Sequence, residues 1–187
     1  MKSIVILFSG EGSNLENIIR SVDPKLVKVS KAITNNPAAP GINRARVLGV
    51  EVEIIDHTLF PSRESFDAEL VKSVRKSNAD LVVLAGFMRI LTPVFTDAIR
   101  NAVNIHPSLL PMFKGADAAR RSFESSMKVA GVTVHWVSAE LDSGEIIDQR
   151  CFYKGNLDFD GFMKRIKEIE QEMYPRVIMD LLTKREI

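Results

Sequence analysis

The chain alternates short, mainly apolar runs with longer segments in which apolar and polar positions are mixed. Short apolar runs bounded by polar or glycine residues are typical of strands buried inside a parallel sheet. They predict strands at residues 4–8, 29–33, 52–55, 81–85 and 102–105. The segments between and after them predict helices at residues 15–20, 41–48, 63–76, 93–100 and 118–126. This alternation indicates a parallel sheet with helices on both faces.

The C-terminal part of the chain follows a different pattern. Residues 129–137 predict a strand that Gly131 interrupts, and the alternating residues 147–153 suit a strand at the edge of the sheet. A long amphipathic helix follows over residues 159–181, and Pro175 should kink it. We therefore expect one α/β domain, with a Rossmann-like, mostly parallel sheet that becomes mixed towards its C-terminal edge and a long C-terminal helix. No repeat or linker divides residues 1–187.

Composition narrows the class of protein. The net charge of +1 over 187 residues gives no electrostatic signature of a nucleic-acid or membrane-surface protein. One cysteine, Cys151, excludes an internal disulfide, and together with three histidines it argues against a structural metal site. The N-terminal apolar run is too short for a signal peptide, and no run approaches a membrane span. We expect a cytoplasmic protein that binds small molecules.

A glycine-containing loop, residues 9–14 (Ser-Gly-Glu-Gly-Ser-Asn), joins the first predicted strand to the first predicted helix. This arrangement can hold a phosphate on the backbone N–H groups at a helix N-terminus. It is not a dinucleotide motif, because Leu15 stands where a third glycine would be and no acidic residue ends the second strand. A mononucleotide or sugar phosphate fits better than NAD, and a plain glycine turn is the alternative. Arg63, in the first turn of a later helix, could add positive charge or be solvated.

Asn104 and His106 end the fifth predicted strand, two residues apart, so their side chains point to the same face. Pro107 keeps His106 extended at the carboxyl end of the strand, where ligands bind in open α/β sheets. A carboxamide can donate to a developing oxyanion, and an imidazole can move protons near neutral pH. The alternative is a strand-end turn with one satisfied histidine and one capping asparagine.

Asp142, in the loop 138–144, could supply the carboxylate that such a histidine needs. Cys151 falls in the middle of a predicted strand, and no serine has the context of a nucleophile. Direct transfer through a tetrahedral intermediate is therefore favoured over a covalent enzyme intermediate. Residues 87–91 could line an apolar slot or belong to the core. His57 is interpreted as a loop histidine without a role.

Four motifs occur in order: 10–15 (Gly-Glu-Gly-Ser-Asn-Leu), 85–91 (Ala-Gly-Phe-Met-Arg-Ile-Leu), 104–111 (Asn-Ile-His-Pro-Ser-Leu-Leu-Pro) and 140–144 (Glu-Leu-Asp-Ser-Gly). With them the chain closely resembles the folate-dependent phosphoribosylglycinamide formyltransferases over nearly its whole length. The resemblance implies transfer of a formyl group from 10-formyltetrahydrofolate, as co-substrate, to the amine of glycinamide ribonucleotide in purine synthesis. It implies no metal, no nucleic acid or membrane partner, and a monomer or homodimer.

The resemblance also assigns residues, and it divides the domain into a phosphate-binding half (about 1–100) and a catalytic and folate-binding half (about 101–187). The catalytic trio would be Asn104, His106 and Asp142. The substrate phosphate and ribonucleotide would be held by Gly12, Ser13, Asn14, Arg63 and Glu170. The folate would be held by Met88, Arg89, Ile90, Leu91, Ser138, Ala139, Glu140 and Leu141.

One segment departs from the family pattern. After the Leu-Leu-Pro element the family commonly has Pro-Gly-Leu-His-x-His, whereas residues 113–119 here read Phe-Lys-Gly-Ala-Asp-Ala-Ala. The Gly-Ala pair is more similar to formyltetrahydrofolate deformylases and to methionyl-tRNA or sugar-nucleotide formyltransferases. A deformylase-like hydrolase, or transfer to another phosphorylated amine, is therefore the alternative function. A non-catalytic folate- or nucleotide-binding module on the same fold is a further alternative.

Overall fold

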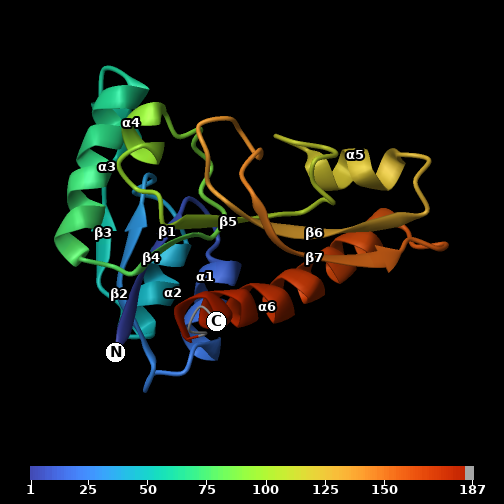
Figure 1. Ribbon diagram of the computed structural model, residues 1–187, viewed down its shortest axis with the longest axis horizontal. Helices are drawn as coiled ribbons and strands as arrows, with labels where there is room; N and C mark the ends of the chain where they lie inside the picture. The colour runs from blue at the N-terminus through green and yellow to red at the C-terminus, as the bar shows by residue number, and fades with distance from the viewer. Residues whose placement is uncertain (184–187) are drawn as a thin grey trace.

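The computed structural model describes residues 1–183, and a seven-stranded sheet runs through this part of the chain (Figure 1). The strands are β1 (Lys2–Phe8), β2 (Val27–Thr34), β3 (Val52–Ile54), β4 (Leu81–Leu84), β5 (Ala102–His106), β6 (Val129–Trp136) and β7 (Ile146–Tyr153). Their order in the sheet is β3-β2-β1-β4-β5-β6-β7. The first five are parallel, and β6 and β7 are antiparallel to their neighbours. The predicted sheet, mixed towards its C-terminal edge, is confirmed.

The helices are α1 (Ser13–Ser21), α2 (Gly41–Val47), α3 (Arg63–Ser77), α4 (Pro93–Thr96), α5 (Ala118–Glu124) and α6 (Phe159–Thr183), with a 3-10 turn η1 (His57–Leu59). α6 is long, as predicted, and runs through Pro175 as one helix. The helix expected at residues 93–100 is only one turn, because the chain then bends so that Ile99 enters the core. None of the helices in residues 1–183 has the length and apolar character needed to cross a membrane.

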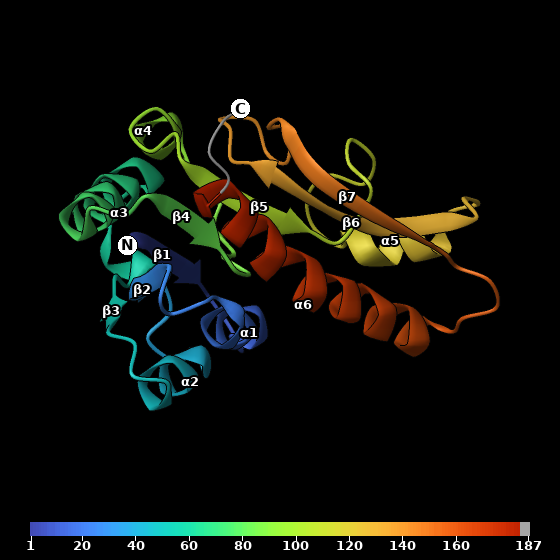
Figure 2. The same ribbon diagram turned by 60° about the horizontal axis from the view of Figure 1, so that its bottom comes forward.

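Helices cover both faces of the sheet, and the alternation of side chains along β1 decides which residues meet which helices. Ile4, Ile6 and Phe8 belong to a core that also contains buried residues of α1, α2 and α6. Val5 and Leu7 belong to a second core that contains buried residues of α3 and α4. Figure 2 shows α1, α2 and α6 together on one side of the sheet, and α3 and α4 grouped at its other side.

Tyr174 of α6 connects that helix to the centre of the sheet. The side chain is fully buried, and its hydroxyl lies 2.9 Å from the carbonyl oxygen of Leu84 and 3.0 Å from that of Val103. Leu84 ends β4, and Val103 directly precedes Asn104 in β5. This contact holds α6 against β4 and β5, the two strands next to which the candidate site is built.

Candidate functional site

The glycine loop after β1 is held in place by its contact with α2. Gly12 has a left-handed φ of 74°, and a Cβ at this position would lie 2.7 Å from Cα of Gly41. The N–H of Gly41 donates to the carbonyl of Gly10 at 3.1 Å. No side chain caps α1, so the first N–H groups of this helix are left for another acceptor. The loop is therefore a backbone site suited to an anion.

A cavity of about 400 Å3, the small cavity, opens beside this loop. Its walls include the predicted phosphate ligands Gly12, Ser13 and Asn14. Its remaining lining residues come from the segments that follow β1, β2, β3 and β4, as the topology of a parallel sheet requires. They are Ser9, Gly10, Glu11, Asn35, Asn36, His57, Ala85, Gly86, Met88 and Arg89.

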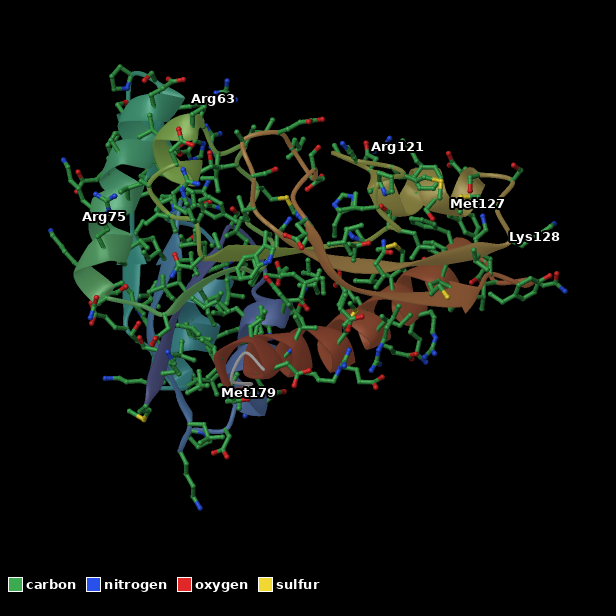
Figure 3. The ribbon with its side chains drawn as sticks, in the orientation of Figure 1. Arg63, Arg75, Arg121, Met127, Lys128 and Met179 are labelled. Atoms are coloured by element: carbon green, nitrogen blue, oxygen red, sulfur yellow. The ribbon has the colours of Figure 1, made fainter. Side chains whose placement is uncertain are left out.

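Glu170 approaches the glycine loop from α6. Its Oε2 accepts a hydrogen bond from Nδ2 of Asn14 at 3.2 Å, although 156 positions separate the two residues in the chain. Burial raises the pKa of Glu170, and the Asn14 amide and Lys167 oppose this shift only in part. The structure thus brings Glu170 and Asn14 together, whereas Arg63 is exposed in the first turn of α3 and does not line the small cavity (Figure 3).

His106 lies at the end of β5 and is buried. Its Nε2 is 2.9 Å from the carbonyl oxygen of Phe113, and its Nδ1 is 3.4 Å from Oδ2 of Asp142. Both ring nitrogens therefore face oxygen acceptors, and only the doubly protonated imidazolium can donate to both. The arrangement therefore directs one ring nitrogen of His106 at a backbone carbonyl and the other at a carboxylate.

Asp142 is presented by a tightly built loop between β6 and β7. Its φ is 49°, and its carboxylate accepts a hydrogen bond from the N–H of Gly115 at 2.8 Å. Two residues further on, a Cβ on Gly144 would collide with the backbone of Trp136. The absence of a side chain at Gly144 thus lets the loop close against β6, and this closure brings Asp142 to His106.

Asn104 meets a second histidine, His135 of β6, which lies directly opposite it in the antiparallel pair. The distance from Nδ2 of Asn104 to Nε2 of His135 is 3.5 Å. The other nitrogen of His135, Nδ1, is 2.9 Å from the carbonyl oxygen of Trp136 and so carries the ring proton. Burial lowers the pKa of His135, an effect that the Trp136 carbonyl and Asp142 oppose and the neighbouring His106 reinforces. A neutral His135 therefore orients the amide of Asn104.

Asn104, His106, His135 and Asp142 all open onto a second cavity of about 570 Å3, the large cavity. Its walls also contain seven of the eight predicted folate ligands: Met88, Arg89, Ile90, Leu91, Ser138, Ala139 and Leu141. Glu140 does not line it, and its side chain instead pairs with Lys114 at 3.3 Å. Gly86, Met88 and Arg89 belong to the walls of both cavities, so the two cavities adjoin.

Arg89 stands between the two cavities with part of its guanidinium uncommitted. Its Nε is buried and is the one side-chain nitrogen or oxygen in residues 1–183 that is buried without a hydrogen-bond partner. The carboxylate of Asp67 accepts hydrogen bonds from the backbone N–H and the hydroxyl of Thr92, at 2.6 Å each. Asp67 also lies close enough to Arg89 to be affected by its charge. Asp67 thereby holds the chain at Thr92, where the predicted folate segment 88–91 ends.

Taken together, the site combines an anion-binding loop, an apolar cavity and a group of polar side chains without a metal cluster. Within the described residues, no three His, Cys, Asp or Glu side chains are arranged to hold a metal ion. A carboxamide donor beside an imidazolium and a carboxylate can stabilise an oxyanion and move a proton.

Comparison with known proteins agrees with this geometry. The family model described as formyl transferase matches residues 2–178. The chain belongs to the formyl transferase family. The phosphoribosylglycinamide formyltransferase of Escherichia coli K12 is 38% identical over 181 residues, which cover 94% of this chain and 85% of that protein.

Solved structures of formyl transferases are also similar to this chain, in both fold and sequence. The phosphoribosylglycinamide formyltransferase of Campylobacter jejuni has a TM-score of 0.94 at 48% identity, covering 97% of this chain and 98% of that one. The enzyme of the same name from Bacillus halodurans has a TM-score of 0.92 at 35% identity, covering 99% and 97%. A trifunctional purine biosynthetic protein of Gallus gallus is 35% identical, but the chain spans only 18% of its length.

The sequence missed two features of this candidate site. His135 received no role, although it contacts Asn104 and lines the large cavity. His57 is not a plain loop histidine, because it lines the small cavity with Nδ1 2.8 Å from the carbonyl oxygen of Asn35. Asn35 in turn accepts from Ser9 Oγ at 2.5 Å, and that hydroxyl accepts from the N–H of Met88 at 2.7 Å. A polar chain therefore runs from His57 to the wall that both cavities share.

Proposed function

We propose that the chain transfers a formyl group from 10-formyltetrahydrofolate to the amine of glycinamide ribonucleotide. The observation that carries this proposal is that Asn104, His106 and Asp142 open onto an apolar cavity which shares a wall with the anion-binding glycine loop. A formyl donor in the large cavity and a phosphorylated amine in the small cavity would therefore meet at these three residues. The names of the E. coli and C. jejuni relatives support this choice of acceptor.

The phosphate of the acceptor would bind the N–H groups of Gly12, Ser13 and Asn14 at the start of α1. Glu170, fixed through its contact with Asn14, would bind the glycinamide end as an acceptor of N–H or O–H groups. Arg63 would add long-range attraction for the phosphate from its exposed position on α3. A charge with this role raises the rate at which the substrate associates with the protein more than it raises the affinity of the complex.

The pterin would lie in the large cavity. The segment 88–91 supplies one wall and residues 138, 139 and 141 supply another, with backbone N–H and C=O groups able to pair with the edge of the ring. Glu140 would act at the rim, through its ion pair with Lys114. Formyl folate enters the reaction as co-substrate, with no metal in the mechanism.

Transfer begins when the neutral amine attacks the formyl carbon. The new C–N bond forms as the carbonyl π pair moves to oxygen, giving a tetrahedral intermediate with an oxyanion. One N–H of Asn104 points towards Nε2 of His135, and the other is free for the oxyanion. The imidazolium of His106 supplies positive charge beside it, and Asp142 keeps that charge in place.

The intermediate then collapses. The attacking nitrogen loses a proton, with Asp142 as the nearest carboxylate, directly or through water, and N10 of the folate gains one as its bond to the formyl carbon breaks. The products are the formylated amide and tetrahydrofolate, so atoms and charges balance. Removing one oxyanion donor typically lowers kcat by about two to three decades. Asn104→Ala or His106→Ala with near-normal turnover would contradict this mechanism.

The deciding experiment measures loss of 10-formyltetrahydrofolate by the purified protein, with and without glycinamide ribonucleotide. Turnover only in the presence of the ribonucleotide supports the proposal. Turnover without an acceptor would instead identify a hydrolase, the alternative suggested by residues 113–119. Turnover only with another phosphorylated amine would support formyl transfer but identify a different acceptor. Folate binding without any turnover would identify a non-catalytic binding module. The cytoplasmic location and the monomeric or dimeric state stay predictions, the second of which light scattering tests.

A further inference from the structure

Residues 113–117, within the segment 113–119 that departs from the family pattern, have an unusual backbone. Phe113, Gly115 and Asp117 have φ values of 59°, 78° and 54°, so every second residue is left-handed. For Phe and Asp this conformation is strained and persists only when surrounding contacts hold it. Contacts on two sides of the loop hold this conformation.

On one side the loop touches the catalytic residues. The carbonyl of Phe113 accepts from Nε2 of His106 at 2.9 Å, and the N–H of Gly115 donates to Oδ2 of Asp142 at 2.8 Å. The first contact fixes the ring of His106, and the second fixes the carboxylate of Asp142. Two backbone groups of one short loop thus hold both members of the pair in place.

On the other side the loop is held by Arg121 of α5. Nη2 of Arg121 donates to the carbonyl of Lys114 and, at 2.9 Å, to the carbonyl of Ala116. The residues alternate: 113 and 115 contact the catalytic pair, while 114 and 116 contact the guanidinium. Figure 3 shows Arg121 on α5, above β6, next to this loop. Lys114 adds a further tie, with Nζ 2.5 Å from Oγ of Ser143 in the Asp142 loop.

The helix that carries Arg121, α5, is itself fixed in place. Lys154, directly after β7, donates from Nζ to the carbonyls of Ser122, Phe123 and Ser125 at 2.8, 3.0 and 2.9 Å, which closes the C-terminal end of α5. α5 also packs on α6 through Phe123, whose ring lies 5.3 Å from those of Phe159 and Phe162. The guanidinium is therefore mounted on a helix anchored to the sheet and to α6.

We propose that Arg121 is a positioning residue for the reaction: by holding the carbonyls of Lys114 and Ala116, it keeps Phe113 on His106 and Gly115 on Asp142. The role rests on the proposed function for its effect on turnover, but the geometric effect does not depend on it. Without the guanidinium the two carbonyls turn to water, the left-handed residues relax, and both backbone contacts with the catalytic pair are lost. A displacement of about 1 Å in such a group can lower turnover by about 100-fold.

The test compares Arg121→Ala with Arg120→Ala. Arg120 is the adjacent residue on the same helix. Its guanidinium pairs with Glu124 at 3.5 Å and lies 4.2 Å from the centre of the Phe159 ring, so it controls for the loss of an arginine from α5. The first readout is the nitrogen-bound ring proton of His106 at Nε2, observed by nitrogen-15 NMR in the protein without substrates. The chain has three histidines, and His57 and His135 donate from Nδ1, so the His106 signal can be assigned with His106→Ala.

We expect R121A to lose the slowly exchanging His106 Nε2–H signal and to lower kcat by about 100-fold, with an unchanged KM for glycinamide ribonucleotide because the small cavity is untouched. R120A should keep the signal and kcat. An R121A variant that keeps both the signal and a kcat within threefold of R120A would overturn the proposal.

If R121A does not fold, as judged by circular dichroism, Arg121→Lys against Arg120→Lys decides by the same two readouts, with partial retention expected because lysine keeps a charged donor. Equal signals and kcat in the two lysine variants would again overturn the positioning role. If the wild type shows no transfer at all, the proposed function fails, and the NMR comparison still decides whether Arg121 positions His106.

Discussion

His106 and Asp142 face each other at 3.4 Å, Nδ1 to Oδ2, with both side chains almost completely buried. The other oxygen of Asp142 lies 3.7 Å from Nε2 of His135, so one carboxylate stands between two imidazoles. Burial lowers the pKa of His135, whose Nδ1 proton is already directed at a backbone carbonyl. Asp142 therefore lies between His135, whose pKa is lowered, and His106, which stands beside Asn104 on β5.

Asp142→Asn should lower kcat by at least about 100-fold, the usual contribution of a proton-moving group. The amide oxygen can still accept from Gly115, so the loop keeps its shape, but the charge that supports protonated His106 is lost. The measurement is kcat for formyl transfer, with KM for both substrates expected to stay close to the wild-type values. Asp97→Asn, an exposed carboxylate at the end of α4, is the control. Equal kcat in the two variants would remove Asp142 from the mechanism.

Gly12→Ala should raise the KM for glycinamide ribonucleotide by about tenfold or more, while the KM for formyl folate stays unchanged. Left-handed φ for a residue with a Cβ costs on the order of 1–3 kcal/mol, and here the Cβ would also lie 2.7 Å from Gly41. Gly49→Ala is the matched control, because Gly49 has a φ of 76° and open space around it. G49A should lower stability without affecting either KM. A normal ribonucleotide KM in G12A would argue against phosphate binding at this loop.

Glu170→Gln should make the protein more stable and a weaker binder of the ribonucleotide. Burial raises the pKa of Glu170 in the folded state above its ordinary value of 4.5, so the folded protein binds more protons than the unfolded chain as pH rises past 4.5. The wild type therefore loses stability through this interval, whereas glutamine does not titrate.

Urea unfolding of Glu170→Gln and the wild type should then show a stability advantage for the variant at pH 7.5 that disappears near pH 4. The ribonucleotide KM should rise by about 10- to 100-fold, the usual value of a hydrogen bond to a charged group. A variant that gains stability without any change in KM would show that Glu170 is only a buried carboxylate. Glu168→Gln, on the exposed side of the same helix, is the control.

Tyr174→Phe should lower the free energy of unfolding by about 1–3 kcal/mol, because it leaves the carbonyls of Leu84 and Val103 without the buried hydroxyl that contacts both. The chain has one other tyrosine, Tyr153, which is exposed, so Tyr153→Phe is a matched control with an expected change near zero. Denaturant unfolding measures both. Equal stability of the two variants would mean that the Tyr174 hydroxyl does not hold α6 to the sheet.

The sheet and the Asn104–His106 pair could be predicted because they depend on local periodicity. Runs of apolar residues identify buried strands, and two side chains two positions apart on a strand always share a face. His135 was missed for the opposite reason. Its contact with Asn104 depends on the antiparallel register of β5 and β6, which places residue 135 opposite residue 104. Only a known strand pairing reveals such a neighbour.

The local sequence also could not show that Glu140, unlike its neighbours, does not line the large cavity. Residues 138, 139 and 141 line the large cavity, but the side chain of Glu140 points to Lys114. Likewise, the sequence predicts Arg63 as a phosphate ligand and Arg89 as a folate ligand, yet only Arg89 lies on the walls of the cavities. Which way a loop side chain turns depends on what packs against the loop.

The amino-acid sequence alone was enough for the order of strands and helices, the glycine loop and the polar pair at the end of β5, because each follows from residues close together in the chain. Tertiary structure alone decided that Asp142 reaches His106, that Glu170 reaches Asn14 across 156 positions, and that Arg121 holds the loop 113–117. These contacts join segments whose separation along the chain carries no information on distance in space. Sheet register and helix packing set them, and those depend on the whole core at once.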